Sequence, residues 1–337
     1  MAVRAISAAG NTVGVLGAAV LDDGGEITIL TNGSGQWEEL VRMEASTSLT
    51  EPLLDITPDS GGFWFVLVSD DVDGVVLHHT DGTIVTEQPI PRFGASDWDN
   101  QYGTIQTSGT GTVSAVLSSN IRGPVLCIRT GDIWIFHEIP GTTDSAKIFS
   151  YQTDSSDHHH ILYQTSTAAP SEYTSFSSAG WMDPAEIGNG SAGSEAGGPL
   201  SLSISDDGGL RAIGFDLSRD LLVMWEYTGG RDWDAEALPI SEDDLIRDHL
   251  SVATAPDGDP CLAAARFNGM SWFDLLWYSY RSGNWEVSVV STGLHRLGVF
   301  NSLRMVEAVI SGAVPHLVFA AFDSGGEQAV LWDAIAR

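Results

Sequence analysis

Lysine is almost absent from this chain of 337 residues, and positive charge is scarce throughout. Lys147 is the only lysine, and 45 acidic residues face 15 basic ones, which gives a formal net charge of −30 at pH 7. A surface of that sign repels nucleic-acid phosphates and anionic lipid headgroups, so we expect no nucleic-acid partner. Two explanations of the scarce lysine stay open: a GC-rich genome, and adaptation to high salt, which screens dense carboxylates.

Long apolar runs are missing as well. A membrane-spanning helix needs about 18 or more continuous apolar residues, and no such stretch occurs. Residues 1–6 also lack the charged segment and apolar core of a secretory signal. We therefore expect no membrane insertion and no signal peptide, and the location stays open between a virion and the cytoplasm.

Helical patterns are the third absence. No segment of helical length carries a convincing 3.6-residue apolar period. Glycine, serine, threonine and aspartate instead interrupt the chain about every 8–12 residues, and the segments between them are rich in β-branched and aromatic residues. This pattern predicts an all-β ring or sandwich.

The clearest internal repeat lies in residues 197–293. Its two halves align with a period of roughly 50 residues, so that Trp225 corresponds to Trp277 and Trp233 to Trp285. Each half reads as four short strands, a unit that buries both its faces only when several copies stack around an axis. We therefore predict one all-β domain over residues 1–337, a seven-bladed β-propeller of four-stranded antiparallel blades. The predicted blades cover about 5–45, 46–90, 97–140, 144–190, 197–241, 245–293 and 297–337.

The last of these units offers only three strands before the chain stops. A ring without exposed sheet edges commonly ties its ends together by a terminal strand that completes the other terminus's blade. Residues 1–5 are predicted to be that strand, beside residues 328–335. The alternative is that they form the inner strand of the first unit.

Two cysteines are present, Cys127 and Cys261, each within an apolar run. The repeat places both on second strands of non-neighbouring units, whereas a disulfide requires Cα atoms about 4.4–6.8 Å apart. We expect two buried free thiols and no catalytic cysteine.

The sequence resembles seven-bladed β-propellers of the sialidase-like and lectin-like groups. Ser205-x-Asp207-x-Gly209 matches the first half of the sialidase Asp-box, although Arg211 stands where its closing threonine is expected. Asp232-Trp233-Asp234 resembles a WD repeat, but the Gly-His that opens such blades is missing. The resemblance implies a fold and, by itself, no function.

A sialidase-like mechanism would need three clustered arginines and a tyrosine nucleophile with a supporting glutamate. The arginines are instead scattered at about one per blade, and neither Tyr278 nor Tyr280 has an obvious partner. We therefore predict a non-catalytic binding protein, with a glycoside hydrolase or lyase as the alternative.

Residues 154–160 contain the densest group of metal-capable side chains. On a strand, His158 and His160 share one face while His159 points away, so two imidazoles and the carboxylate of Asp154 or Asp157 can meet one ion. A polar turn entering a strand explains the same residues, and we favour that interpretation. A second acidic loop, Asp71-x-Asp73-Gly74, lacks the later carboxylates of a calcium loop. We predict no metal and no cofactor.

Aromatic residues fall into two groups. Trp37, Trp181, Trp233 and Trp285 recur at the start of outer strands and are predicted to pack between blades rather than to bind a ligand. Aromatic and arginine residues in the connecting loops suit sugars or protein loops instead. The predicted partner is a glycan or a protein surface, with assembly into a larger particle such as a virion as one setting. The predicted ligand-binding residues are Arg92, Trp98, Tyr102, Trp272, Arg296 and Phe300.

Overall fold

The computed structural model describes residues 3–45, 53–59, 61–91, 102–118, 123–166, 169–187, 201–205, 208–216, 221–241, 250–254, 259–267, 272–281, 284–295, 306–311, 314–322 and 329–335. Regular structure in these ranges consists of β-strands. They contain no helix long and apolar enough to cross a bilayer.

The strands of the first half of the chain form three four-stranded sheets and the start of a fourth sheet. Their bounds are β1 (Val3–Gly10), β2 (Leu16–Asp22), β3 (Glu26–Thr31) and β4 (Glu38–Glu44); β5 (Leu54–Pro58), β6 (Trp64–Asp70), β7 (Gly74–Thr80) and β8 (Val85–Pro89); β9 (Tyr102–Thr107), β10 (Val113–Ser118), β11 (Val125–Thr130) and β12 (Ile133–Glu138); and β13 (Lys147–Thr153), β14 (His159–Gln164) and β15 (Ser171–Ser177).

The second half completes the fourth sheet and adds three more. Its strands are β16 (Gly180–Trp181) and β17 (Ala185–Glu186); β18 (Ser201–Ile204), β19 (Leu210–Asp216), β20 (Leu221–Gly229) and β21 (Asp232–Ser241); β22 (Leu250–Thr254), β23 (Pro260–Phe267), β24 (Trp272–Arg281) and β25 (Asn284–His295); and β26 (Val306–Ser311), β27 (Val314–Phe322) and β28 (Ala329–Ile335).

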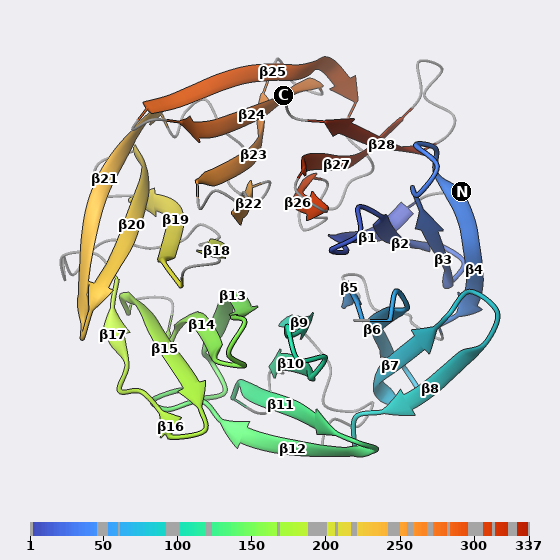
Figure 1. Ribbon diagram of the computed structural model, residues 1–337, viewed down its shortest axis with the longest axis horizontal. Coiled ribbons are helices and arrows are strands. Elements are labelled where there is room, and N and C mark those ends of the chain that lie inside the picture. Colours follow the sequence, from blue (N-terminus) through green and yellow to red (C-terminus); the bar gives the residue numbers. More distant parts are fainter. Residues whose placement is uncertain are drawn as a thin grey trace.

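These seven antiparallel sheets stand around a common axis, each with its first strand innermost (Figure 1). Burial follows that order. The second strand β6 is buried almost along its whole length, because neighbouring sheets cover both of its faces, and it therefore reads as the unbroken apolar run Trp64–Val68. The outer strand β8 is mostly exposed and carries polar residues. Apolar clusters fill the joints between sheets, and Gly17 is required at one of them, since a Cβ there would lie 2.5 Å from the Trp64 ring.

A buried carboxylate ties three inner strands together. Asp55 on β5 accepts hydrogen bonds from Ser7 Oγ of β1 at 2.6 Å and from Thr104 Oγ1 of β9 at 2.6 Å. The backbone amides of Ile56 and Ile105 donate to the same carboxylate at 3.0 and 2.8 Å. Four donors thus satisfy the buried charge and hold three consecutive sheets in register around the axis.

The turn from the first to the second strand has one hydrogen-bond pattern in five of the described sheets. The amide of its first residue donates to the carbonyl four residues later at 2.9–3.0 Å. The fourth residue has a positive φ, which glycine adopts without strain. That residue is Gly14 (91°), Gly62 (87°), Gly111 (86°), Asp157 (60°) or Gly208 (85°). The turn of the fourth sheet is therefore the exception.

The structure corrects the predicted closure of the ring. Residues 3–10 form β1, which pairs with β2 as the innermost strand of the first sheet. The last described sheet, β26–β28, has three strands, so no terminal strand completes it among the residues described. The fourth sheet also differs from the predicted four strands, because it has five. Leu16 of the first sheet packs with Val309 and Val318 of the last. The ring is therefore closed by side-chain packing where a shared strand was expected.

Both cysteines are buried and free, as predicted. Their placement differs in one respect, because Cys261 lies on a second strand, β23, but Cys127 lies on β11, the third strand of its sheet.

Candidate functional site

Four of the six predicted ligand-binding residues lie outside the described parts of the chain: Arg92, Trp98, Arg296 and Phe300. The other two have defined backbone positions. Tyr102 opens β9 opposite Ser118, and Trp272 opens β24 opposite His295. The grouping of the six therefore stays a prediction. The described structure presents two other groups of side chains, both of which involve the fourth sheet.

The first group surrounds a pocket of about 760 Å³ between the fourth and fifth sheets. Its lining comes from β15 and β17 of the fourth sheet and from β20 and β21 of the fifth. In Figure 1 the strands β17 and β21 lie at the outer side of the ring. Charged and polar side chains make up most of the pocket's lining, together with one tryptophan. The lining residues are Glu172, Pro184, Glu186, Thr228, Arg231, Asp232, Trp233 and Asp234.

An aromatic trio supports one side of this pocket. The Trp233 ring packs edge-on against Tyr173 with centroids 5.3 Å apart, and lies 5.1 Å from Tyr227. Tyr173 and Tyr227 are 5.4 Å apart, so each ring contacts the other two. Tyr173 is fully buried and Trp233 half-buried, which leaves part of the indole accessible on a rigid support. An indole held in this way is an apolar platform with a fixed orientation.

The β20–β21 turn supplies the positive charge of the pocket. Gly229 and Gly230 both have positive φ values, 109° and 65°, which allow the tight reversal before Arg231. Tyr227 Oη donates to the Gly230 carbonyl at 2.9 Å and anchors the turn to the aromatic trio. The guanidinium of Arg231 is exposed and pairs with Asp183 at 3.0 Å. Such an exposed pair contributes little stability and exchanges readily for a ligand.

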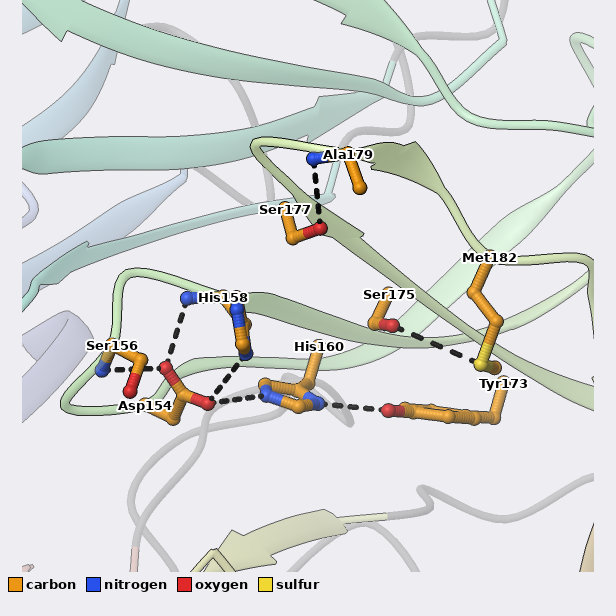
Figure 2. A network of polar contacts seen from close by, with 9 residues as sticks. All are labelled: Asp154, Ser156, His158, His160, Tyr173, Ser175, Ser177, Ala179 and Met182. Atoms are coloured by element: carbon orange, nitrogen blue, oxygen red, sulfur yellow. Dashed lines mark hydrogen bonds and ion pairs between the residues drawn. The ribbon is translucent and has the colours of Figure 1, made fainter. Parts of the chain in front are cut away.

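The second group lies in the β13–β14 hairpin. Asp154 Oδ2 lies 3.0 Å from His158 Nδ1 and 3.4 Å from His160 Nε2. The other oxygen, Oδ1, accepts the amides of Ser156 and His158 at 2.8 and 2.9 Å. Figure 2 shows the carboxylate pointing at both imidazoles. These three side chains, which we call the Asp154 cluster, are the group suited to a metal ion in the described part of the chain.

The strand alternation expected at these histidines is confirmed. His158 and His160 meet Asp154 on one face, whereas His159 points to the other and lies 2.8 Å from Tyr151 Oη. The second ring nitrogen of His160, Nδ1, lies 2.8 Å from Tyr173 Oη (Figure 2). The Asp154 cluster is thereby joined to the aromatic trio of the pocket.

Burial shifts several of these groups toward their neutral forms. Desolvation lowers the pKa of His159 to about 4 and also lowers that of His160. Burial raises the pKa of Tyr173. For Asp154, burial alone would raise the pKa, but hydrogen bonds from the amides of His158 and Ser156 and from His160 outweigh it, so the net shift is downward. At neutral pH the cluster therefore pairs an ionised carboxylate with the neutral imidazole of His160.

The sequence pointed to the histidines but not to the pocket. The four outer-strand tryptophans pack against apolar clusters, as predicted, yet Trp233 also lines the pocket. The sequence feature that could have indicated this role is the set of charged residues around Trp233. In Gly230-Arg231-Asp232-Trp233-Asp234 the tryptophan follows an arginine at a glycine turn. The corresponding segment at Trp285 reads Ser282-Gly283-Asn284-Trp285-Glu286 and has no arginine beside the tryptophan.

Comparison with solved structures finds several proteins of similar fold, among them a fungal lectin that recognises fucose. The lectin of Aleuria aurantia in complex with Fucα1-6GlcNAc matches with a TM-score of 0.59 at 14% identity, covering 86% of this chain and 96% of the lectin. AofleA from Arthrobotrys oligospora matches with a TM-score of 0.59 at 14% identity, covering 89% and 91%. YCF48 bound to D1 peptide matches with a TM-score of 0.53 at 13% identity, covering 100% and 92%.

No protein-family model matches the sequence, and no curated protein does. At these identities the solved structures show the fold alone, an all-β propeller. They also correct the predicted fold class. The Aleuria aurantia lectin is described as a six-bladed β-propeller, whereas the sequence predicted seven blades. The described residues of this chain form seven sheets, one more than that lectin has blades.

Proposed function

We propose that this protein is a non-catalytic propeller that binds a glycan in the pocket between the fourth and fifth sheets. The observation that carries the proposal is the joint presence of Trp233, Arg231 and several carboxylates around one pocket. Sugars present an apolar C–H face and a rim of hydroxyls. A fixed indole suits the first, and guanidinium and carboxylate groups that donate and accept hydrogen bonds suit the second.

The similarity to lectins supports a fucoside as the first ligand to test. Structures with this fold and comparable coverage are those of the Aleuria aurantia lectin with α-methyl-L-fucoside and with Fucα1-6GlcNAc. The pocket of about 760 Å³ has room for a disaccharide of that kind.

The test is a calorimetric titration with α-methyl-L-fucoside and Fucα1-6GlcNAc. We expect saturable binding by the unmodified protein, and a loss of at least about 10-fold in affinity for Trp233→Ala and for Arg231→Gln, because each removes a contact worth about 1.5 kcal/mol or more. Arg42→Gln is the matched control: this exposed arginine of the first sheet also pairs with carboxylates, Glu26 and Glu39, and its loss should leave affinity unchanged.

Two outcomes would contradict the proposal. The absence of binding across a glycan array, with a stable co-purifying protein, would assign the pocket to a protein partner. Release of free sugar from a fucosylated substrate, abolished by Glu172→Gln, would make the protein a hydrolase.

A further inference from the structure

We infer that Asp154, His158 and His160 form a binding site for a divalent transition-metal ion of the zinc type. Two imidazole nitrogens and one carboxylate oxygen are a donor set that zinc accepts, whereas calcium and magnesium prefer oxygen alone. Three protein ligands also leave one position of a tetrahedral ion for water or an incoming donor atom.

The distances within the Asp154 cluster fit such an ion. Tetrahedral zinc with bonds of about 2.0–2.1 Å holds neighbouring ligand atoms about 3.3–3.4 Å apart. Asp154 Oδ2 lies 3.0 Å from one imidazole nitrogen and 3.4 Å from the other, and the three ligand atoms lie within 4.8 Å of one another. Closing the remaining gap requires movement of His158, whose side chain is 46% exposed.

The groups around the ligands are arranged as at many metal sites. A metal-binding histidine commonly uses its second ring nitrogen for a hydrogen bond that fixes the ring, and His160 Nδ1 lies 2.8 Å from Tyr173 Oη. Asp154 is fixed in the same way, since its Oδ1 accepts two backbone amides and leaves Oδ2 directed at the imidazoles. Asp154 and His160 are therefore preorganised.

The fourth sheet departs from the repeat at these residues. Positions five and seven of the equivalent turns hold Val15 and Gly17 in the first sheet, and Phe63 and Phe65 in the second. Only in the fourth, among the five turns described, do both positions carry histidine. In the same turn Asp157 replaces the left-handed glycine, and its carboxylate accepts a hydrogen bond from Thr110 of the third sheet. Local departures from a repeated pattern are expected at functional or strained sites.

The second sheet supplies a matched comparison. Asp59 opens its turn and accepts the amides of Gly61 and Phe63 in the same way, at 2.7 Å each, and its Oδ2 lies 3.3 Å from His79 Nε2. That site has one imidazole and one carboxylate, too few ligands for tight binding.

The experiment uses the full chain after dialysis against a chelator. Titration with zinc chloride by calorimetry is expected to give one tight site per chain, and cobalt(II) is expected to give the intense visible absorption of a tetrahedral N/O site. Asp154→Asn, His158→Gln and His160→Gln should each weaken zinc at least about 10-fold, since each removes a ligand. His79→Gln is the control and should bind zinc as the unmodified protein does.

Because His158 is half-exposed, His158→Gln will fold even if His160→Gln does not, and circular dichroism checks both. The inference is overturned if the unmodified protein binds no zinc, or if His158→Gln binds zinc as tightly as the unmodified protein does. Glycan binding is measured separately with metal-free protein, so a failure of the metal site leaves the pocket proposal intact.

Discussion

The hydroxyl of Tyr173 lies 2.8 Å from Nδ1 of His160, while the ring of Tyr173 packs edge-on against Trp233. One buried side chain thus contacts both the Asp154 cluster and the aromatic trio of the pocket. The hydroxyl belongs to the first contact and the ring to the second. These two contacts can be separated by removing one atom.

Tyr173→Phe is the variant that separates them. It keeps the ring beside Trp233 and removes the partner of His160, so we expect zinc affinity to fall about 10–100-fold, as for other groups that orient a metal-binding histidine. Affinity for α-methyl-L-fucoside should change less than about 2-fold, since the stacking area is retained. Parallel calorimetric titrations with each ligand measure both effects. A large loss of fucoside affinity would show that the hydroxyl itself matters to the pocket.

The inner strands provide a prediction about stability. Asp55 is buried and receives hydrogen bonds from Ser7, Ile56, Thr104 and Ile105. Asp55→Ala leaves these donors without an acceptor, and we expect it to lower the free energy of unfolding by at least about 3 kcal/mol. Urea denaturation followed by tryptophan fluorescence measures the change. Asp132→Ala, at a side chain 99% exposed, should stay within about 0.5 kcal/mol of the unmodified protein.

The hydrogen bonds of Asp55 also illustrate how much of the fold could be predicted from the sequence. Strands, turns and the stacked repeat follow from local patterns, because apolar runs and glycine turns recur with a fixed period. The hydrogen bonds of Asp55 with Ser7 and Thr104 could not be predicted from local patterns. These two residues are 48 and 49 positions away from Asp55 in the sequence, and polar residues of this kind are common in loops.

The same distinction applies to the candidate site. His158 and His160 could be placed on one face because strand alternation is a local rule. The pocket could not be found, because Glu172 of the fourth sheet and Trp233 of the fifth approach only when two sheets pack together. The closure of the ring was wrongly predicted for a related reason: a short apolar terminus pairs equally well with either neighbouring sheet, and packing decides which.

The repeated first turn yields a second prediction about stability. Gly62 has a φ of 87°, and a Cβ at this position meets no atom within 4 Å. Gly62→Ala should therefore cost about 1–2 kcal/mol of unfolding free energy through backbone strain alone. Gly62→Asn should cost less, because asparagine tolerates the left-handed region, as Asp157 does at the equivalent position. Chemical denaturation of both variants gives the comparison, and equal losses would contradict the conformational explanation.

The excess of negative charge predicts a strong response to salt. With a net charge of −30, carboxylates repel one another over a screening length of about 10 Å at 0.1 M salt, which shortens to about 3 Å at 1 M. Stability should therefore rise steeply from low to molar sodium chloride. Thermal unfolding across that range is the measurement. A flat melting temperature would favour a GC-rich genome, and not salt adaptation, as the reason for the scarce lysine.

The last prediction concerns pH and rests on His78 of β7. Its side chain is buried, and Nδ1 has no hydrogen-bond partner among the described residues; Glu87, on the neighbouring strand, lies 3.6 Å away. Burial lowers the pKa of His78 below its ordinary value of 6.5, against the opposing charges of Glu87 and Asp70. The unfolded chain therefore binds a proton at a higher pH than the folded chain does.

Stability contributed by neutral His78 is thus complete above pH 6.5 and is lost as the pH falls from 6.5 toward the lowered pKa of the folded state. His78→Gln removes this term, so the difference in unfolding free energy between pH 7.5 and pH 5 should be smaller in the variant than in the unmodified protein. His79→Gln removes a partly exposed imidazole from the same strand and controls for the loss of a histidine. All three proteins carry the same carboxylates. Equal pH dependence in the His78 variant and the unmodified protein would therefore mean that protonation of His78 is not coupled to unfolding.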